Sequence, residues 1–217
     1  MSFEQLIQFI QTVDDSLIHY VDLYGKTIYL LLFLIVFAKT AFIVLIFLPG
    51  DTMVFASGAL AAMSDLDLLV LTPLFIFAGF LGDQSNFLIG KTFGLTRKKS
   101  KLLQKLLPQT MLDKSQNYLT SYGKTAIMFA RFIPILRGTL PFTCATTNYP
   151  YRKFVVYNFI GCVLWTAAWL FGGFLLGNIP FVQNNLVLTL FILSIVFILP
   201  AFINFFKKAK QVDTAEK

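Results

Sequence analysis

Apolar residues run in long blocks along this chain, and the length of each block predicts how it meets a membrane. Residues 68–95 and 154–177 are apolar runs long enough to cross a bilayer, which takes about 20 helical residues. Residues 184–206 form a third such run, whereas the apolar residues 52–63 are too few to cross. We therefore predict an all-α integral membrane protein with about three spanning helices.

Two other apolar segments contain residues that break helices. The first arm of one, residues 28–48, ends at Pro49-Gly50, and the other segment contains Pro134 and Pro141. Proline removes a backbone donor, and broken backbone at membrane depth is tolerated only where it is buried in protein or lines a wet cavity. We interpret each segment as a re-entrant helical hairpin, with a full crossing by the first arm as the alternative.

Arg131 and Arg137 lie inside the second of these segments. A charge at the bilayer centre costs roughly 3 kcal/mol on insertion scales, so each arginine needs a partner. One candidate is the phosphate of a lipid, because guanidinium offers planar, bidentate donors and stays charged. The other is a pair of structural ion pairs with Asp51 and Asp83. Both can hold if the ligand competes for the carboxylates.

Three further charges fall in apolar segments. Asp51 follows the first break, where it is either a helix cap or a proton carrier or gate partner, and Asp83 is either such a group or a structural partner of an arginine. Lys39 either adds a third cation to the site or pairs with Asp51. Polar and small residues of the 68–95 helix share one face that should point inward: Gly79, Gly82, Asp83, Asn86 and Gly90.

Amphipathic stretches precede each broken segment. Residues 3–24 place apolar side chains at helical spacing opposite polar ones, which predicts a helix lying on the membrane surface. A second amphipathic helix should begin near Thr110. Tyr24-Gly25-Lys26-Thr27 recurs as Tyr122-Gly123-Lys124-Thr125, each time before a broken segment and then a spanning helix.

The repeat divides a single membrane domain, residues 1–217, into two halves. Residues 1–95 and 108–178 each contain one hairpin and one spanning helix, and residues 184–206 add an extra helix. Hairpins that enter from opposite sides make an inverted repeat, which is typical of secondary transporters with a site at midplane.

Composition and charge set the class and the orientation. The chain is 57% apolar and 13% charged, where a soluble domain has about 25% charged residues. Its net charge of +7 is concentrated in residues 97–105, 152–153 and the tail at 207–210. Basic loops mark the cytoplasmic side, so the C-terminus should be cytoplasmic and the acidic 64–67 loop external.

The sequence lacks the residue patterns of several common functional sites. The sequence has no dinucleotide or phosphate-binding glycine loop and no Cys/His metal cluster, so we expect no cofactor and no metal. Nucleic acid is a poor fit for so apolar a chain. Cys144 and Cys162 both lie in apolar segments, where we expect small packing residues rather than a disulfide.

Motifs spread over residues 20–180 resemble one family. They are Phe47-Leu48-Pro49-Gly50-Asp51, Gly82-Asp83, Asn86-Phe87, Ile89-Gly90-Lys91-Thr92-Phe93-Gly94, Ala130-Arg131-Phe132-Ile133-Pro134, Arg137, Tyr151-Arg152-Lys153-Phe154, Tyr157-Asn158, Gly161 and Trp165. In order and spacing they resemble the DedA family of membrane proteins, also called the SNARE-associated or VTT-domain family.

The resemblance implies a multi-pass protein of the bacterial cytoplasmic membrane with paired re-entrant hairpins. Family members are thought to move lipid phosphates such as undecaprenyl phosphate, or phospholipids, and several are linked to proton-motive force, so an anionic lipid and protons are the implied partners. The family usually has an acidic residue where this chain has Lys39, and glycines near Thr143-Cys144-Ala145-Thr146. The first departure removes a protonatable carboxylate.

Three functions fit these residues. The first is a flippase that translocates an anionic lipid phosphate, with Arg131, Arg137 and Lys39 binding substrate and with Asp51 and Asp83 coupling or gating. The second is a membrane scaffold or assembly factor whose buried ion pairs only hold the fold. An enzyme acting on lipid phosphate is third, because no nucleophile lies beside a base. A homo-oligomer is compatible with each.

Overall fold

The computed structural model describes residues 27–42, 50–63, 66–93, 108–183 and 189, and within them every regular element is a helix. The first half holds α2 (Thr27–Ala41), α3 (Gly50–Ala61) and α4 (Leu68–Phe93). The remaining elements are α6 (Gln109–Tyr122), α7 (Lys124–Phe129), the 3-10 turn η3 (Ala130–Phe132), α8 (Pro134–Thr146), α9 (Tyr151–Thr166), the π-helical turn η4 (Ala167–Phe171), α10 (Gly172–Gly177) and α11 (Pro180–Gln183). The amphipathic stretch 3–24 lies outside the described residues.

Two helices of this bundle are long and apolar enough to cross a membrane, Leu68–Thr92 in α4 and Tyr151–Gly177 in α9 to α10. Both expose large apolar side chains: Leu69, Phe77, Leu81, Leu88, Val156, Phe159, Ile160, Leu164, Phe171 and Leu175. Water would penalise such a surface and lipid would not. The all-α membrane class is confirmed, while the third predicted span, 184–206, lies outside the described residues apart from Thr189.

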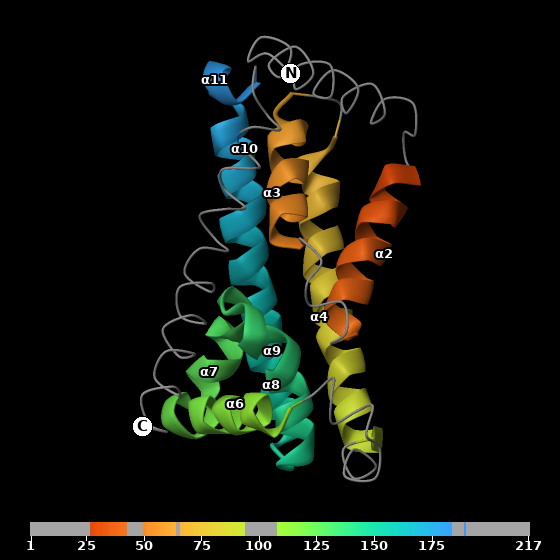
Figure 1. Ribbon diagram of the computed structural model, residues 1–217. Coiled ribbons are helices and arrows are strands. Elements are labelled where there is room, and N and C mark those ends of the chain that lie inside the picture. Colours follow the sequence, from red (N-terminus) through yellow and green to blue (C-terminus); the bar gives the residue numbers. More distant parts are fainter. Residues whose placement is uncertain (1–26, 43–49, 64–65, 94–107, 184–188, 190–217) are drawn as a thin grey trace, which may run out of the picture.

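The shorter helices pack against opposite ends of the two long ones (Figure 1). In that view α2 and α3 lie along the upper parts of α4 and α10, and α6, α7 and α8 lie beside the lower parts of α4 and α9. Helix α6 runs across the long axes at the lower end, as expected of an amphipathic surface helix, and it begins at Gln109, next to the predicted Thr110.

Each end of the bundle has its own apolar core. One core joins α2, α3, α4, the end of α9 and η4 through Leu32, Val36, Val54, Leu71, Phe75, Ala78, Trp165 and Leu170. The other core joins α4 with α6, α7, η3, α8 and α9. In it Phe87 stacks on Phe154, with 4.8 Å between the ring centres. Along α4, Asp83 lies between Ala78 of the first core and Phe87 of the second. A polar layer therefore separates the two cores.

Local chemistry explains where several helices begin. The Asp67 carboxylate accepts the Leu69 N–H at 2.7 Å and so caps α4. Gly123 separates α6 from α7 with a φ of 55°, a conformation that glycine adopts without steric cost. Pro134 occupies the first position of α8, and Ile133 before it is extended, as the residue preceding a proline usually is.

The predicted break at Pro141 is wrong, because α8 continues through it to Thr146. Proline cannot donate a hydrogen bond to the Arg137 carbonyl one turn earlier. The next carbonyl along the helix, that of Gly138, accepts a hydrogen bond from Asn86 Nδ2 at 2.8 Å, which ties α8 to α4 beside the proline. The break in this segment is the η3 turn and Ile133, before Pro134.

Helix α3 lies unusually close to the α9–α10 helix. A Cβ built on Gly173 would collide with the Phe55 carbonyl oxygen, and one on Gly58 would collide with the Leu170 carbonyl oxygen. At Gly177 the Ala59 backbone would be 2.7 Å away. These glycines let two backbones touch, as small residues do between membrane helices.

Candidate functional site

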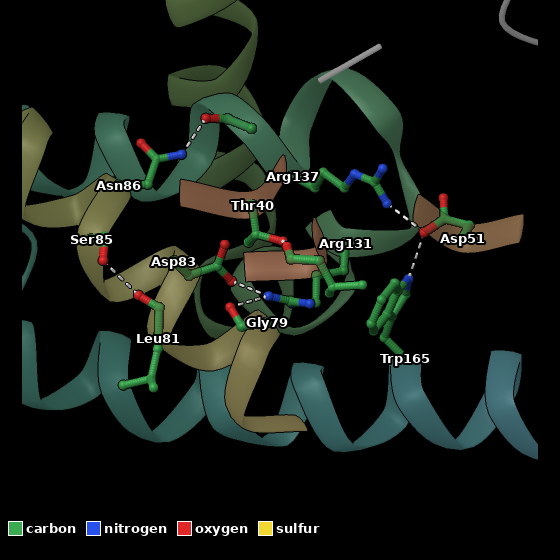
Figure 2. A network of polar contacts seen from close by, with 12 residues as sticks. Thr40, Asp51, Gly79, Leu81, Asp83, Ser85, Asn86, Arg131, Arg137 and Trp165 are labelled. Atoms are coloured by element: carbon green, nitrogen blue, oxygen red, sulfur yellow. Dashed lines mark hydrogen bonds and ion pairs between the residues drawn. The ribbon is translucent and has the colours of Figure 1, made fainter. Parts of the chain in front are cut away.

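Two arginine–carboxylate pairs occupy the polar layer between the cores (Figure 2). Arg131 on η3 pairs with Asp83 on α4, with 2.7 Å between Nη2 and Oδ2, and both side chains are at most 5% exposed. Arg137 on α8 pairs with Asp51 on α3 at 2.5 Å, with side chains 15% and 28% exposed. Both arginines therefore pair with Asp51 and Asp83, which was one of the two alternatives left open by the sequence.

Trp165 of α9 connects the two pairs. The guanidinium carbon of Arg131 lies 5.2 Å from the centre of the Trp165 ring, a cation–π distance. On its other side the indole Nε1 donates to Asp51 Oδ1 at 3.1 Å. Figure 2 shows Trp165 between Arg131 and Asp51. Charges from four elements, α3, α4, η3 and α8, thus belong to one network.

In the sequence, Trp165 stood only among the motifs that resemble the family. The structure buries it, with 3% of its surface exposed, and its indole N–H donates to the network. A buried indole N–H usually needs an acceptor, and the aspartates were the available acceptors in the apolar segments. That requirement is the signal that would have included Trp165 in the site.

Glycines of α4 make room for the network. The Gly79 carbonyl accepts a hydrogen bond from Arg131 Nη2 at 2.7 Å, and a Cβ at this position would lie 2.5 Å from Nη1. Gly82 faces Thr40 of α2, whose Cβ would be 2.6 Å from a Cβ there. The inward polar face of α4 is confirmed, since Asp83 is 2% exposed and Asn86 is fully buried.

The network encloses a small cavity of about 10 Å³, roughly the space that one water molecule requires. Its lining comes from α2, α3, α4, η3, α8 and α9: Val36, Lys39, Thr40, Gly50, Asp83, Arg131, Arg137, Gly138 and Trp165. A cavity of this size has no room for a group larger than a water molecule, so the site is closed in this conformation.

Lys39 lies at this cavity but does not pair with Asp51. Among the described residues the Asp51 carboxylate is bonded to Arg137 and Trp165, and Lys39 makes no ion pair. The predicted Lys39–Asp51 pair is therefore wrong, because Arg137 occupies the carboxylate. Asp51 also does not precede α3 as a cap, since α3 begins at Gly50.

Part of the Arg131 guanidinium has no acceptor. Its Nε is buried and lacks a hydrogen-bond partner among the described residues. An unmet donor on a buried charged group costs free energy. The arginine therefore retains capacity for a further acceptor, such as a phosphate oxygen.

Other predicted residues lie around this network. Gly50 is the first residue of α3 and Pro134 the first of α8, while Pro49 lies outside the described residues. Cys144 and Cys162 are buried and free, as expected of packing residues. The described residues contain no group of three or more His, Cys, Asp or Glu side chains placed to hold a metal ion.

A larger groove of about 910 Å³ lies along α4 beyond the site. It begins at Leu81 and Gln84, next to Asp83, and extends to Lys91. Its other walls come from Phe37, Ser85, Phe87, Leu88, Ala145, Asn148, Tyr149, Pro150 and Tyr151. The groove combines apolar walls with a cation at one end, which suits an amphipathic ligand.

Apolar helices that enclose two arginine–carboxylate pairs define a helical membrane protein with a buried charged site. The chain belongs to the DedA family, because the VTT domain matches residues 48–175. This match includes Asp51, Asp83, Arg131 and Arg137 and leaves out Lys39.

Similar proteins span most of the chain. Protein DedA of Escherichia coli strain K12 is 36% identical over 98% of this chain and 97% of that protein. An uncharacterized membrane protein of Mycobacterium leprae is 31% identical over 72% of this chain and 70% of that protein. The inner membrane protein YghB of Escherichia coli strain K12 is 26% identical over 74% and 73%. No solved structure matches the chain significantly.

Proposed function

We propose that this protein is a flippase, and not an enzyme, which moves an anionic lipid phosphate such as undecaprenyl phosphate or a phospholipid across the cytoplasmic membrane. The observation that carries the proposal is the Trp165-linked network of Arg131 and Arg137 inside the bundle. Buried arginines are costly in a membrane protein and mark substrate pathways. Guanidinium binds phosphate oxygens in a planar, bidentate geometry.

The short helices act as two re-entrant hairpins that gate the site. Helix α2 has 15 residues and α3 has 12, so each is about 18–22 Å long at 1.5 Å per residue, against the roughly 30 Å of a bilayer core. They lie at the end of the long helices opposite α7 and α8 (Figure 1). Access from alternate sides follows if one hairpin opens while the other stays closed.

Substrate entry requires exchange of partners. In the closed state Asp83 and Asp51 occupy Arg131 and Arg137. A lipid phosphate that enters from the groove beside α4 offers oxygens that replace these carboxylates, and the released carboxylates are the coupling or gating groups. Lys39 adds a third cation to the phosphate site. The acyl or prenyl chain lies along the apolar groove wall.

The proposed orientation follows the charge of the loops. Basic segments favour the cytoplasmic side, which supports a cytoplasmic C-terminus and a second hairpin that enters from that side. Protons and the proton-motive force are candidate drivers, and a homo-oligomer is compatible with the exposed apolar faces.

Transport by purified protein in liposomes tests the function. We expect a labelled prenyl phosphate to change leaflets in liposomes that contain the wild-type protein, and the matching prenyl alcohol not to respond. Replacement of both arginines, Arg131→Ala with Arg137→Ala, should reduce the rate to that of empty liposomes. Release of inorganic phosphate from the lipid would instead indicate an enzyme.

A scaffold or assembly role is the second candidate. It is favoured by the closed cavity and by the fact that both arginines already have carboxylate partners. A scaffold predicts no lipid movement by the wild-type protein, together with normal function in cells of any variant that folds without the arginines.

Introduction of a carboxylate at the cavity should make transport depend on pH. In Lys39→Glu the new carboxyl group faces Arg131 and Arg137 as well as the carboxylates Asp51 and Asp83. When ionised, this carboxylate attracts the two arginines, whereas the ammonium group that it replaces repels them. Because the carboxylate is neutralised as the pH falls, its attraction for the arginines depends on pH. We expect the rate–pH profile in liposomes to differ from the wild-type profile. Superimposable profiles would exclude a coupling role for position 39.

A further inference from the structure

Trp165 contacts both ion pairs of the polar layer at once. Arg131 lies 5.2 Å from the centre of its ring, and its indole Nε1 donates to Asp51 Oδ1 at 3.1 Å. The side chain is buried, and its ring belongs to the apolar core around α2, α3 and α4. A ring packed in this way cannot adjust to one of its polar neighbours without changing its contact with the other.

A single oxygen of Asp51 serves both Arg137 and Trp165. Asp51 Oδ1 accepts one hydrogen bond from Arg137 Nη1 and one from Trp165 Nε1. Whatever moves this carboxylate away from Arg137 therefore also takes the acceptor away from the indole. A buried N–H without an acceptor is unfavourable, which favours a turn of the ring toward another acceptor.

The same ring stabilises Arg131. Arg131 Nη2 is bonded to Asp83 and to the Gly79 carbonyl, whereas its Nε has no hydrogen-bond partner among the described residues. The attraction between a guanidinium group and an indole requires the cation to lie near the ring face. A hydrogen bond from the indole to a carboxylate also polarises the ring, which strengthens this attraction. Arg131 is therefore held less firmly when the ring turns or when Asp51 leaves.

The two pairs differ in how easily they open. The side chains of Asp51 and Arg137 are partly exposed, whereas those of Asp83 and Arg131 are buried. Water or a ligand therefore reaches Asp51 and Arg137 first. Separation of a buried pair is costly because each charge is left without a partner, so the Arg131–Asp83 pair opens only with help from a neighbour.

We infer that Trp165 is a positioning residue that couples the two arginines: opening of the Arg137–Asp51 pair turns the indole and loosens Arg131. The two guanidinium groups then act as one site and not as two independent ones. Use of this coupling to bind a lipid phosphate rests on the proposed function, whereas the coupling itself is a property of the protein alone.

Thermal unfolding of the full-length protein in detergent, followed by circular dichroism, measures the coupling as a change in the unfolding temperature, Tm. Asp51→Ala removes the acceptor of the indole, Asp83→Asn removes the charge that faces Arg131, and the two are made alone and together. Each set is made in the wild-type chain, in Trp165→Phe, which keeps a ring but has no N–H, and in Trp169→Phe. Trp169 is the matched control, because it packs against the same apolar core but does not line the cavity.

In the wild-type chain we expect the double variant to lose about 2–4 °C less in Tm than the sum of its single variants, the size usual for residues of one network. Trp169→Phe should show the same difference, and Trp165→Phe should lose most of it. Asp51→Asn, which keeps a neutral acceptor, is a milder second variant and should give a smaller difference of the same sign. An equal difference in all three backgrounds would overturn the inference, because the pairs would then interact without the indole.

Fluorescence of Trp165 separates this inference from the proposed function. In Trp169→Phe it is the remaining tryptophan of the chain, and its emission is followed as lysophosphatidic acid or the phosphate-free monoacylglycerol is added. A shift with lysophosphatidic acid alone, together with the Trp165-dependent difference in Tm, supports both. The difference in Tm without a shift supports the coupling and contradicts a lipid phosphate as ligand. A shift without the difference in Tm supports the ligand and contradicts the coupling.

Discussion

Arg131→Ala is expected to lower the free energy of unfolding by about 3–5 kcal/mol, the usual cost of removing one member of a buried ion pair. The substitution leaves Asp83, which is 2% exposed, without its cation. It also removes the hydrogen bond to the Gly79 carbonyl and the contact with the Trp165 ring. Thermal unfolding in detergent measures the loss.

A paired replacement separates the charge from the fold. In Arg131→Met with Asp83→Leu neither charge remains, and exchange of a buried ion pair for apolar side chains of similar size is often neutral or stabilising. We expect this variant to unfold within about 1 kcal/mol of wild type. A variant as unstable as Arg131→Ala would mean that the network stabilises the fold beyond its charge balance.

Gly173→Ala is expected to destabilise the protein by about 3 kcal/mol, the upper end of the range for overpacking. The added Cβ falls on the Phe55 carbonyl oxygen, 2.9 Å from its carbon and 3.1 Å from the Ala59 nitrogen. All three are backbone atoms of α3, so no side chain can rotate away. For a chain of this size the change corresponds to a fall in Tm of about 6–12 °C.

The neighbouring glycine provides the control for this prediction. Nothing lies within 4 Å of a Cβ built on Gly172, so Gly172→Ala has only the helix preference for alanine, a gain of about 0.5–1 kcal/mol. Equal behaviour of the two variants would show that close contact between α3 and α10 does not stabilise the fold.

Sequence pattern alone predicted the features that depend on hydrophobic periodicity. The two spanning helices, the inward face of α4 and the amphipathic helix after residue 108 follow from which positions are apolar. The sequence also named Asp51 and Asp83 as possible partners of the two arginines, because a membrane offers so few partners for a buried charge, but not which carboxylate each arginine takes.

Features that depend on side-chain geometry were not predictable. Arg137 and Lys39 were both candidate partners of Asp51, and only the three-dimensional placement of α8 beside α3 pairs the carboxylate with Arg137. Pro141 was expected to break the helix, but the helix is interrupted earlier, at the η3 turn and Ile133, and α8 continues through Pro141. The π-helical turn at Ala167–Phe171 has no clear sequence signal. It connects α9 to α10, whose glycines Gly173 and Gly177 contact the backbone of α3.

The most direct test of the central claim, that the buried arginines bind a lipid phosphate, is transport by Arg131→Met with Asp83→Leu in liposomes. If the arginine is there for the lipid, the variant should unfold like wild type and yet move labelled prenyl phosphate no faster than empty liposomes do. Wild-type transport by this variant would contradict the account, because lipid movement would then not require the buried Arg131 charge.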